Sequence, residues 1–208
     1  MIVNNIQRDK KHLTKVTFDN GKEILLDNDI LGENGIKTGT FLTEEEVEEL
    51  RFSSDYTRAK SRALWYLDRM DYTEKALYEK LVKAGFGKKA SAAVIARFCE
   101  LGVIDDRRYA ERLAARFSEN NVSKREAMQK MALKGLSYDL IKQVLSEQET
   151  DEETQITNLL EGKYAYKLTL ENGTEKVYAA LIRKGFSYSA VKTAMKKYIE
   201  QLEFCEEY

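Results

Sequence analysis

The sequence is poor in the residues that break helices and in those that build catalytic or metal sites. Its 208 residues include no proline, one histidine and two cysteines, whereas 33% are charged and 43% are hydrophobic. A chain without proline keeps every backbone donor and has no residue that must kink a helix, so we expect long helices. Cys99 and Cys205 lie far apart without a CxxC or Cys/His pattern, which predicts neither a disulfide framework nor a zinc site.

The same scarcity excludes several classes of protein. His12 is the only histidine, so Ser/His/Asp and Cys/His sites have a single candidate base, and we interpret it as an exposed loop residue. Neither GxxxxGK[ST] nor GxGxxG occurs, which argues against nucleotide hydrolysis. No run of about 18 apolar residues indicates a membrane span, and the N-terminus lacks the apolar core of a signal peptide. We therefore predict a cytoplasmic protein that is not an enzyme and needs no cofactor or metal.

Glycine marks a repeat of fifty residues. Amphipathic helical patterns end in KLVKAGF, KMALKGL and ALIRKGF, in which the glycines are Gly85, Gly135 and Gly185. A large apolar residue follows each one, namely Phe86, Leu136 and Phe186. Glycine takes the left-handed conformation at low cost, and the next apolar residue then folds back onto the helix. All six residues are thus predicted to have a structural role as helix endings.

Helical spacing of apolar residues on both sides of each glycine predicts three helices per unit, in the first copy near 57–68, 73–84 and 88–100. We expect a mainly α protein in which three units, 56–102, 103–150 and 151–208, form an elongated tandem array. The third unit is less regular, because Lys163 and Lys167 occupy expected core positions of its first helix. Residues 167–173 are interpreted as a helix plus a loop.

Residues 1–55 are predicted to form a small accessory domain. The segment KVTFDNGKEILL at 15–26 has β-favouring residues on both sides of Asn20-Gly21, which predicts a β-hairpin. A short helix is expected at 44–50, where Thr43 and Glu46 match a capping box.

The acidic segment GVIDDRRYAERL at 102–113 has two interpretations. Asp105, Asp106 and Glu111 could be ligands of a metal-dependent nuclease. The favoured interpretation is structural, with Asp105 as a helix N-cap and Asp106 at the positive end of the helix dipole.

Basic residues gather in the middle of the chain, where residues 57–150 carry 19 basic and 13 acidic side chains. Arg108, Arg112 and Arg116 recur every four residues and so share one side of a helix. The next predicted helix adds four further basic residues: Lys124, Arg125, Lys130 and Lys134. These seven either bind phosphates or an acidic protein groove, or form a solvated rim over the core. Aromatic residues such as Trp65 and Tyr109 sit at core spacing and are predicted to pack, whereas Tyr138 and Tyr188 are expected to be partly exposed.

Several motifs together resemble the RecX family of RecA regulators. They are the repeated L-x-x-x-G-F/L ending, GVIDDRRYA at 102–110 and IRKGFSYSAV at 182–191. The hairpin, LTEEEVEEL at 42–50 and AKSRALWYLDRMDYTEKALYEKL at 59–81 are similar to the extended members common in Gram-positive bacteria.

The resemblance implies a monomeric regulator that lies in the groove of the RecA–single-stranded-DNA filament. Such a regulator lowers RecA-driven ATP hydrolysis, strand exchange and repressor cleavage, and thereby acts in recombination, DNA repair and the SOS response. The seven basic residues are our candidates for its DNA-facing or RecA-facing surface, and contact with DNA is expected to be weak or to run through RecA. The alternative is a helical-repeat or helix-turn-helix module that binds DNA or protein without RecA.

Overall fold

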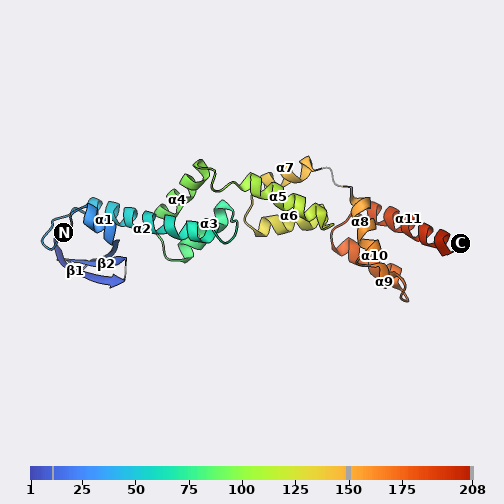
Figure 1. The fold of residues 1–208 in the computed structure, drawn as a ribbon, viewed down its shortest axis with the longest axis horizontal. Coiled ribbons are helices and arrows are strands. Elements are labelled where there is room, and N and C mark those ends of the chain that lie inside the picture. The colour runs from blue at the N-terminus through green and yellow to red at the C-terminus, as the bar shows by residue number, and fades with distance from the viewer. Residues whose placement is uncertain (11, 149–150, 207–208) are drawn as a thin grey trace. The chain divides into compact units, whose positions relative to one another are not determined.

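The computed structural model describes residues 1–10, 12–148 and 151–206, which include three strands and eleven helices (Figure 1). The chain divides into two compact units, Met1–Asp105 and Asp106–Tyr208. Four clusters of buried apolar side chains form the cores, two within each unit, and each cluster comes from a separate stretch of the chain. The mainly α fold with a small N-terminal sheet agrees with the fold class predicted from the sequence.

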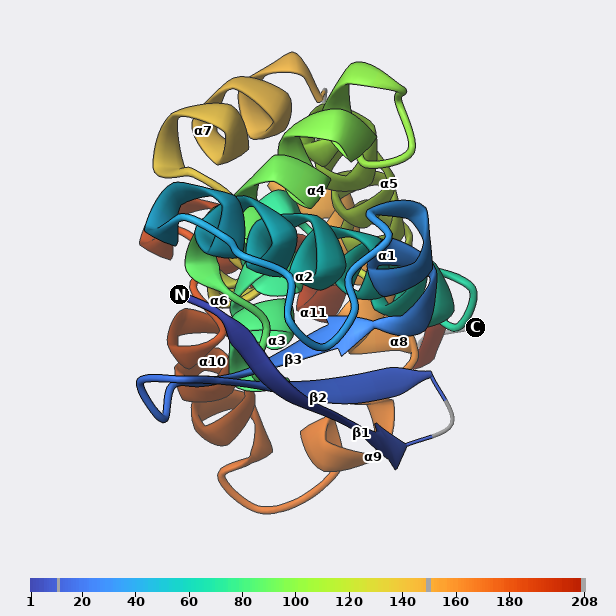
Figure 2. The same cartoon turned by 90° about the vertical axis from the view of Figure 1, so that its left-hand side faces the viewer.

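A three-stranded antiparallel sheet begins the first unit, in the order β1 (Val3–Lys10), β2 (Leu13–Phe18) and β3 (Glu23–Asp27). The predicted hairpin is β2–β3, and Gly21 in its turn has φ +80°. β1 was not predicted, because only Val3 of its eight residues is buried and the strand has no apolar alternation to reveal it. Figure 2 shows α1 (Asn28–Glu33) and α2 (Glu44–Leu67) over one face of the sheet.

The helix α2 is longer than the sequence predicts. Thr43 and Glu46 form the expected capping box, but the helix then runs on for 24 residues instead of ending near residue 50. No glycine or proline interrupts it. Its middle is also fixed from both sides, since Ser54 Oγ accepts a bond from the Asp27 amide at 2.7 Å, and Asp55 Oδ2 accepts one from the Gly87 amide at 3.2 Å. The proposed boundary between residues 55 and 56 therefore falls inside a helix.

Three helical repeats follow the sheet. The first packs the end of α2 against two helices, α3 (Glu74–Lys83) and α4 (Lys88–Glu100). The second consists of α5 (Asp106–Glu119), α6 (Lys124–Leu133) and α7 (Tyr138–Glu147). The third consists of α8 (Glu152–Glu161), α9 (Ala165–Leu168), α10 (Gly173–Arg183) and α11 (Tyr188–Glu206).

The helices α3, α6 and α10, one in each repeat, end in the same way. Gly85, Gly135 and Gly185 have φ of +93°, +94° and +92°. Each glycine amide donates to the carbonyl three residues earlier, at 3.0, 2.9 and 2.9 Å. The amides of Phe86 and Phe186 reach the carbonyls five residues earlier, at 3.3 and 3.4 Å. These paired bonds form the Schellman motif, the ending that the fifty-residue spacing predicts.

The third repeat departs from the others in its first helix. α8 has 10 residues where α5 has 14. Lys163 and Lys167 therefore lie after α8, in the turn and in the short helix α9, and both are exposed. Their charge no longer conflicts with a core position, since Ile156 and Leu160 fill the core from α8.

Candidate functional site

Within the described residues, no group of three or more histidine, cysteine, aspartate or glutamate side chains is placed to hold a metal ion. Asp105 immediately precedes α5 and Asp106 is its first residue, as expected for side chains that stabilise a helix start. His12 is exposed beside the sheet, where its carbonyl accepts a bond from the Asn28 amide. No helix in the described segments is long and apolar enough to cross a membrane.

The exposed face of α5 presents the first three candidates. Arg108, Arg112 and Arg116 are all exposed and follow one another about 40° apart around the helix, while the opposite side buries Ala110 and Leu113. The three arginines therefore form one continuous stripe, which we call the α5 stripe.

Arg107, next to the stripe, is used within the repeat. Its Nη2 donates to Glu147 Oε2 at 2.8 Å and its Nε to Glu111 Oε1 at 2.9 Å. The bond to Glu147, together with the charges of both carboxylates, raises the pKa of Arg107. This pairing ties α5 to α7.

The four basic residues predicted on α6 do not share one face. All four are exposed, but Arg125 and Lys134 are nine residues apart, which places them on opposite sides of the helix, about 180° from each other. Lys130 lies close to α5, since its Nζ is 5.6 Å from the centroid of the Phe117 ring. The helix thus presents Lys130 and Lys134 on one side, with Lys124 and Arg125 at its start.

Arg125 faces the junction between the second and third repeats. A Cβ on Gly185 would lie 2.9 Å from the Arg125 Cβ, and Ser123 Oγ donates to the Lys184 carbonyl at 2.5 Å. Glu126 lies between Lys130, at 2.7 Å, and Lys184, at 3.6 Å. Partial burial would raise the pKa of Glu126, but the two lysines outweigh it and hold that pKa below its ordinary value. Arg125 is therefore a contact of the repeat junction.

The fifty-residue register reveals basic residues that the sequence analysis missed. Arg58 and Arg62 on α2 correspond to Arg108 and Arg112 on α5, and Lys80 on α3 corresponds to Lys130 on α6. The equivalent positions of the third repeat hold no basic residue: Asn158, Gly162 and Ala180. Applying the register to charged positions, and not only to apolar ones, would have found them. Basic residues at these register positions are thus shared by the first two repeats, although Arg58 is half-buried, with its Nη1 3.5 Å from Asp55 Oδ1 and its Cζ 5.4 Å from the Phe86 ring centroid.

Cations also lie over aromatic rings in both repeats. In the first, Lys80 Nζ is 4.6 Å from the Tyr66 ring centroid, and Arg62 Cζ is 6.0 Å from it. In the second, Lys130, the equivalent of Lys80, has its Nζ 5.6 Å from the ring centroid of Phe117, which corresponds to Leu67 rather than to Tyr66. Trp65 was predicted to pack in the core, yet it is 46% exposed, so that prediction is wrong. The helical spacing of apolar residues predicted a core position, but Trp65 has Arg62 and Arg69 as its neighbours one turn away on α2 and beyond its end.

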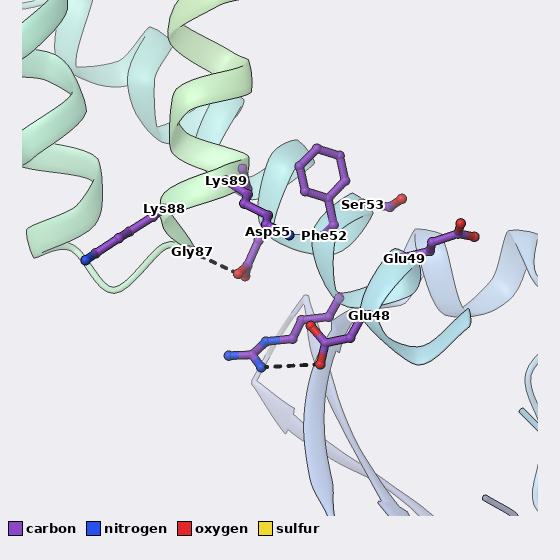
Figure 3. Close-up of a pocket in the computed structure, with 10 residues that line it drawn as sticks. Glu48, Glu49, Phe52, Ser53, Asp55, Gly87, Lys88 and Lys89 are labelled. Carbon is purple, nitrogen blue, oxygen red and sulfur yellow. Dashed lines mark hydrogen bonds and ion pairs between the residues drawn. The ribbon is translucent and has the colours of Figure 1, made fainter. Parts of the chain in front are cut away.

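A cavity of about 540 Å³ opens between the middle of α2 and the start of α4. Figure 3 shows Glu48 and Phe52 on the α2 side and Lys88 near the start of α4, with the bond from the Gly87 amide to Asp55 between the two helices. Charges of both signs line it, and Glu48 is engaged by Arg51 at 3.9 Å. The lining favours no single class of ligand.

Taken together, the three helical repeats, two of which carry basic residues in register, define a helical-repeat protein. Residues 59–98 match the family model described as RecX, first three-helix domain. The regulatory protein RecX of Streptococcus pneumoniae serotype 19F (strain G54) is 30% identical over 199 residues, which cover 93% of this chain and 76% of the relative. The corresponding protein of strain ATCC BAA-255 / R6 gives the same values.

Two solved structures have a similar fold. A crystal structure of regulatory protein RecX matches with a TM-score of 0.65 at 20% identity, covering 94% of this chain and 98% of that chain. RecX from Lactobacillus salivarius matches with a TM-score of 0.63 at 22% identity, covering 70% of this chain and 97% of that one. The chain belongs to the RecX family, as the sequence motifs indicated.

Proposed function

We propose that this protein acts in the cytoplasm as a non-enzymatic regulator that binds the RecA–single-stranded-DNA filament and restrains RecA activity. Family membership supports this proposal, since the relatives are named regulatory proteins. The observation that carries it is the pair of arginines repeated in register, Arg58 and Arg62 on α2 and Arg108 and Arg112 on α5. A partner with a regular repeat offers equivalent contacts to equivalent faces.

The proposed contacts combine phosphate and protein recognition. Arginine binds phosphates and carboxylates through a planar fork of donors, which suits both DNA and an acidic groove of RecA. The α5 stripe makes the contacts in the second repeat, together with Lys124, Lys130 and Lys134 of the α6 segment. Phosphate contacts position a protein without reading sequence, so binding should not depend on the bases flanking the site.

The test is single-strand-dependent ATP hydrolysis by the cognate RecA, with this protein titrated below one molecule per RecA. We expect the wild-type protein to suppress hydrolysis and Arg112→Glu/Arg116→Glu to need a higher concentration for the same effect. Lys192→Glu/Lys196→Glu is the matched control, because it reverses two exposed lysines four residues apart on α11, outside the proposed faces. Thermal unfolding of each variant establishes that it is folded.

The outcome separates three possibilities. Equal suppression by both double variants would contradict the assignment of the α5 stripe. Absence of any suppression by the wild-type protein, with RecA active, would contradict the regulatory function itself. A duplex of preferred sequence that binds more tightly than single strands would instead indicate a helical module that acts on DNA without RecA.

A further inference from the structure

Trp65 is the only tryptophan of the chain, and its side chain is 46% exposed near the end of α2. Two arginines of the same region lie against its ring. Arg69 Cζ is 3.6 Å from the ring centroid and Arg62 Cζ is 5.4 Å from it. Arg69 is held there, because its Nη1 donates to the Trp65 carbonyl at 2.9 Å. The indole and the two guanidinium groups therefore form one preorganised surface feature.

This feature continues into two tyrosines. The rings of Trp65 and Tyr66 have centroids 5.3 Å apart, and those of Tyr66 and Tyr72 are 6.2 Å apart. Lys80 reaches both tyrosines, with its Nζ 4.8 Å from the Tyr72 ring centroid and donating to the Tyr72 hydroxyl at 2.7 Å. We call these residues the Trp65 cluster: Arg62, Trp65, Tyr66, Arg69, Tyr72 and Lys80.

Trp65 does not belong to the core of the first repeat. Tyr66 and Tyr72 pack partly against the buried cluster of this repeat, whereas nearly half of the indole surface stays in water. Leu64 and Met70 beside it are also exposed, at 48% and 52%. An exposed apolar patch that holds its cations in fixed places is typical of a binding surface.

The second repeat lacks these aromatic residues. In the fifty-residue register, Trp65, Tyr66 and Tyr72 correspond to Ala115, Arg116 and Val122. The cations Arg62 and Lys80, by contrast, have basic equivalents in the second repeat. The first repeat has therefore added an aromatic surface to a shared basic face, which points to a ligand with both charged and flat, unsaturated parts.

We propose that the Trp65 cluster binds single-stranded nucleic acid, with an unpaired base stacked on Trp65 and its guanidinium neighbours and the adjoining phosphates held by Arg62 and Lys80. Unpaired bases stack on aromatic rings and on arginine planes irrespective of sequence. The surface is partly neutralised, since Asp68 and Asp71 follow the helix end. Stacking rather than long-range attraction thus supplies the affinity, and the salt dependence should be shallow.

This inference rests on the proposed function in one respect, which is that a RecA filament would supply the single strand. It is tested without RecA, on the full chain, by tryptophan fluorescence. Because Trp65 is the only tryptophan, every change in that emission reports on this site. We expect an oligothymidylate to quench it, and an abasic deoxyribose-phosphate oligomer of the same length to quench it far less. Equal effects of the two oligomers, or none, would overturn the proposal.

Affinity is measured separately from the anisotropy of a labelled oligothymidylate. Trp65→Ala should weaken binding by about tenfold, as expected for one lost base stack, while Trp65→Phe retains part of the affinity. Phe52→Ala is the matched control, since Phe52 is an aromatic residue of α2, 41% exposed, beside Glu48 and Glu49. We expect it to bind as the wild type does.

The two proposals fail in different ways. Unchanged single-strand affinity in Trp65→Ala, together with weaker suppression of RecA, would show that the Trp65 cluster contacts protein and would overturn the stacking site alone. Quenching and a loss of affinity in Trp65→Ala, with no effect of the wild type on RecA, would support the stacking site and contradict the regulatory function.

Discussion

Alanine at Gly185 should destabilise the protein more than alanine at Gly85, although the two glycines end equivalent helices with nearly equal φ, +92° and +93°. Their surroundings differ. A Cβ on Gly85 meets no atom within 4 Å, whereas one on Gly185 would lie 2.9 Å from the Arg125 Cβ and 3.1 Å from Ser123 Oγ. The comparison therefore separates the cost of backbone conformation from the cost of crowding the repeat junction.

The expected magnitudes follow from these two costs. A residue with a Cβ in the left-handed region costs about 1–2 kcal/mol, which applies at both positions. Overpacking adds about 1–3 kcal/mol at Gly185. Its neighbours cannot easily move away, because the Arg125 Cβ is fixed to the backbone of α6 and Ser123 Oγ bonds the Lys184 carbonyl. Gly85→Ala should thus cost about 1–2 kcal/mol, and Gly185→Ala about 2–5 kcal/mol.

Urea unfolding followed by two signals measures both effects. Far-ultraviolet circular dichroism reports on helices of the whole chain, and the emission of Trp65 reports on the first unit only. Gly85→Ala should shift the fluorescence transition to lower urea, whereas Gly185→Ala should shift only the part of the dichroism transition that belongs to the second unit. Equal losses of stability in the two variants would refute the reasoning, since the junction would then offer no resistance to the added methyl group.

Three further predictions concern single residues. Gly173→Ala should destabilise the third repeat by more than about 1 kcal/mol, because its Cβ would clash with the Lys167 carbonyl oxygen; an unchanged dichroism melting curve would contradict this. Because the pKa of Glu126 is depressed in the folded protein, its charge contributes stability at neutral pH, and this stability is lost as the pH falls below the ordinary glutamate value of about 4.3. In Glu126→Gln the urea midpoint should therefore fall less steeply with decreasing pH across that range. Thr43→Ala should cost about 1 kcal/mol through the lost cap of α2, and Thr43→Ser should restore most of it; equal midpoints for the two variants would argue against the cap.

The features that the sequence predicted correctly depend on neighbouring residues. The hairpin turn at Asn20-Gly21 requires a positive φ that glycine supplies, and this signal is complete within a few residues. Features that depend on distant partners were missed. β1 is recognisable only by its pairing with β2. In the middle of α2, Ser54 and Asp55 accept bonds from the amides of Asp27 and Gly87, and these distant partners leave no trace in the local pattern.

The same distinction applies to the candidate residues. Helical spacing was enough to group Arg108, Arg112 and Arg116, because a single helix fixes their relative directions. Spacing along α6 could not show that Arg125 lies against Gly185 of the next repeat. Trp65 was assigned to the core because apolar periodicity marks a helix face without showing whether another element covers that face.

The two basic faces should cooperate when one strand is long enough to contact both. A second contact made by a strand that is already bound is intramolecular, so affinity then exceeds that of either face alone. In the proposed binding mode, the first face supplies Trp65 for a base and the second supplies the α5 stripe for phosphates. Wild-type affinity for oligothymidylate should therefore rise steeply above a threshold length. Both Trp65→Ala and Arg112→Glu/Arg116→Glu should remove that rise while short oligomers still bind the intact face. A constant fold-loss at every length would mean that a single strand does not connect the faces, and each repeat would then contact a different part of the filament.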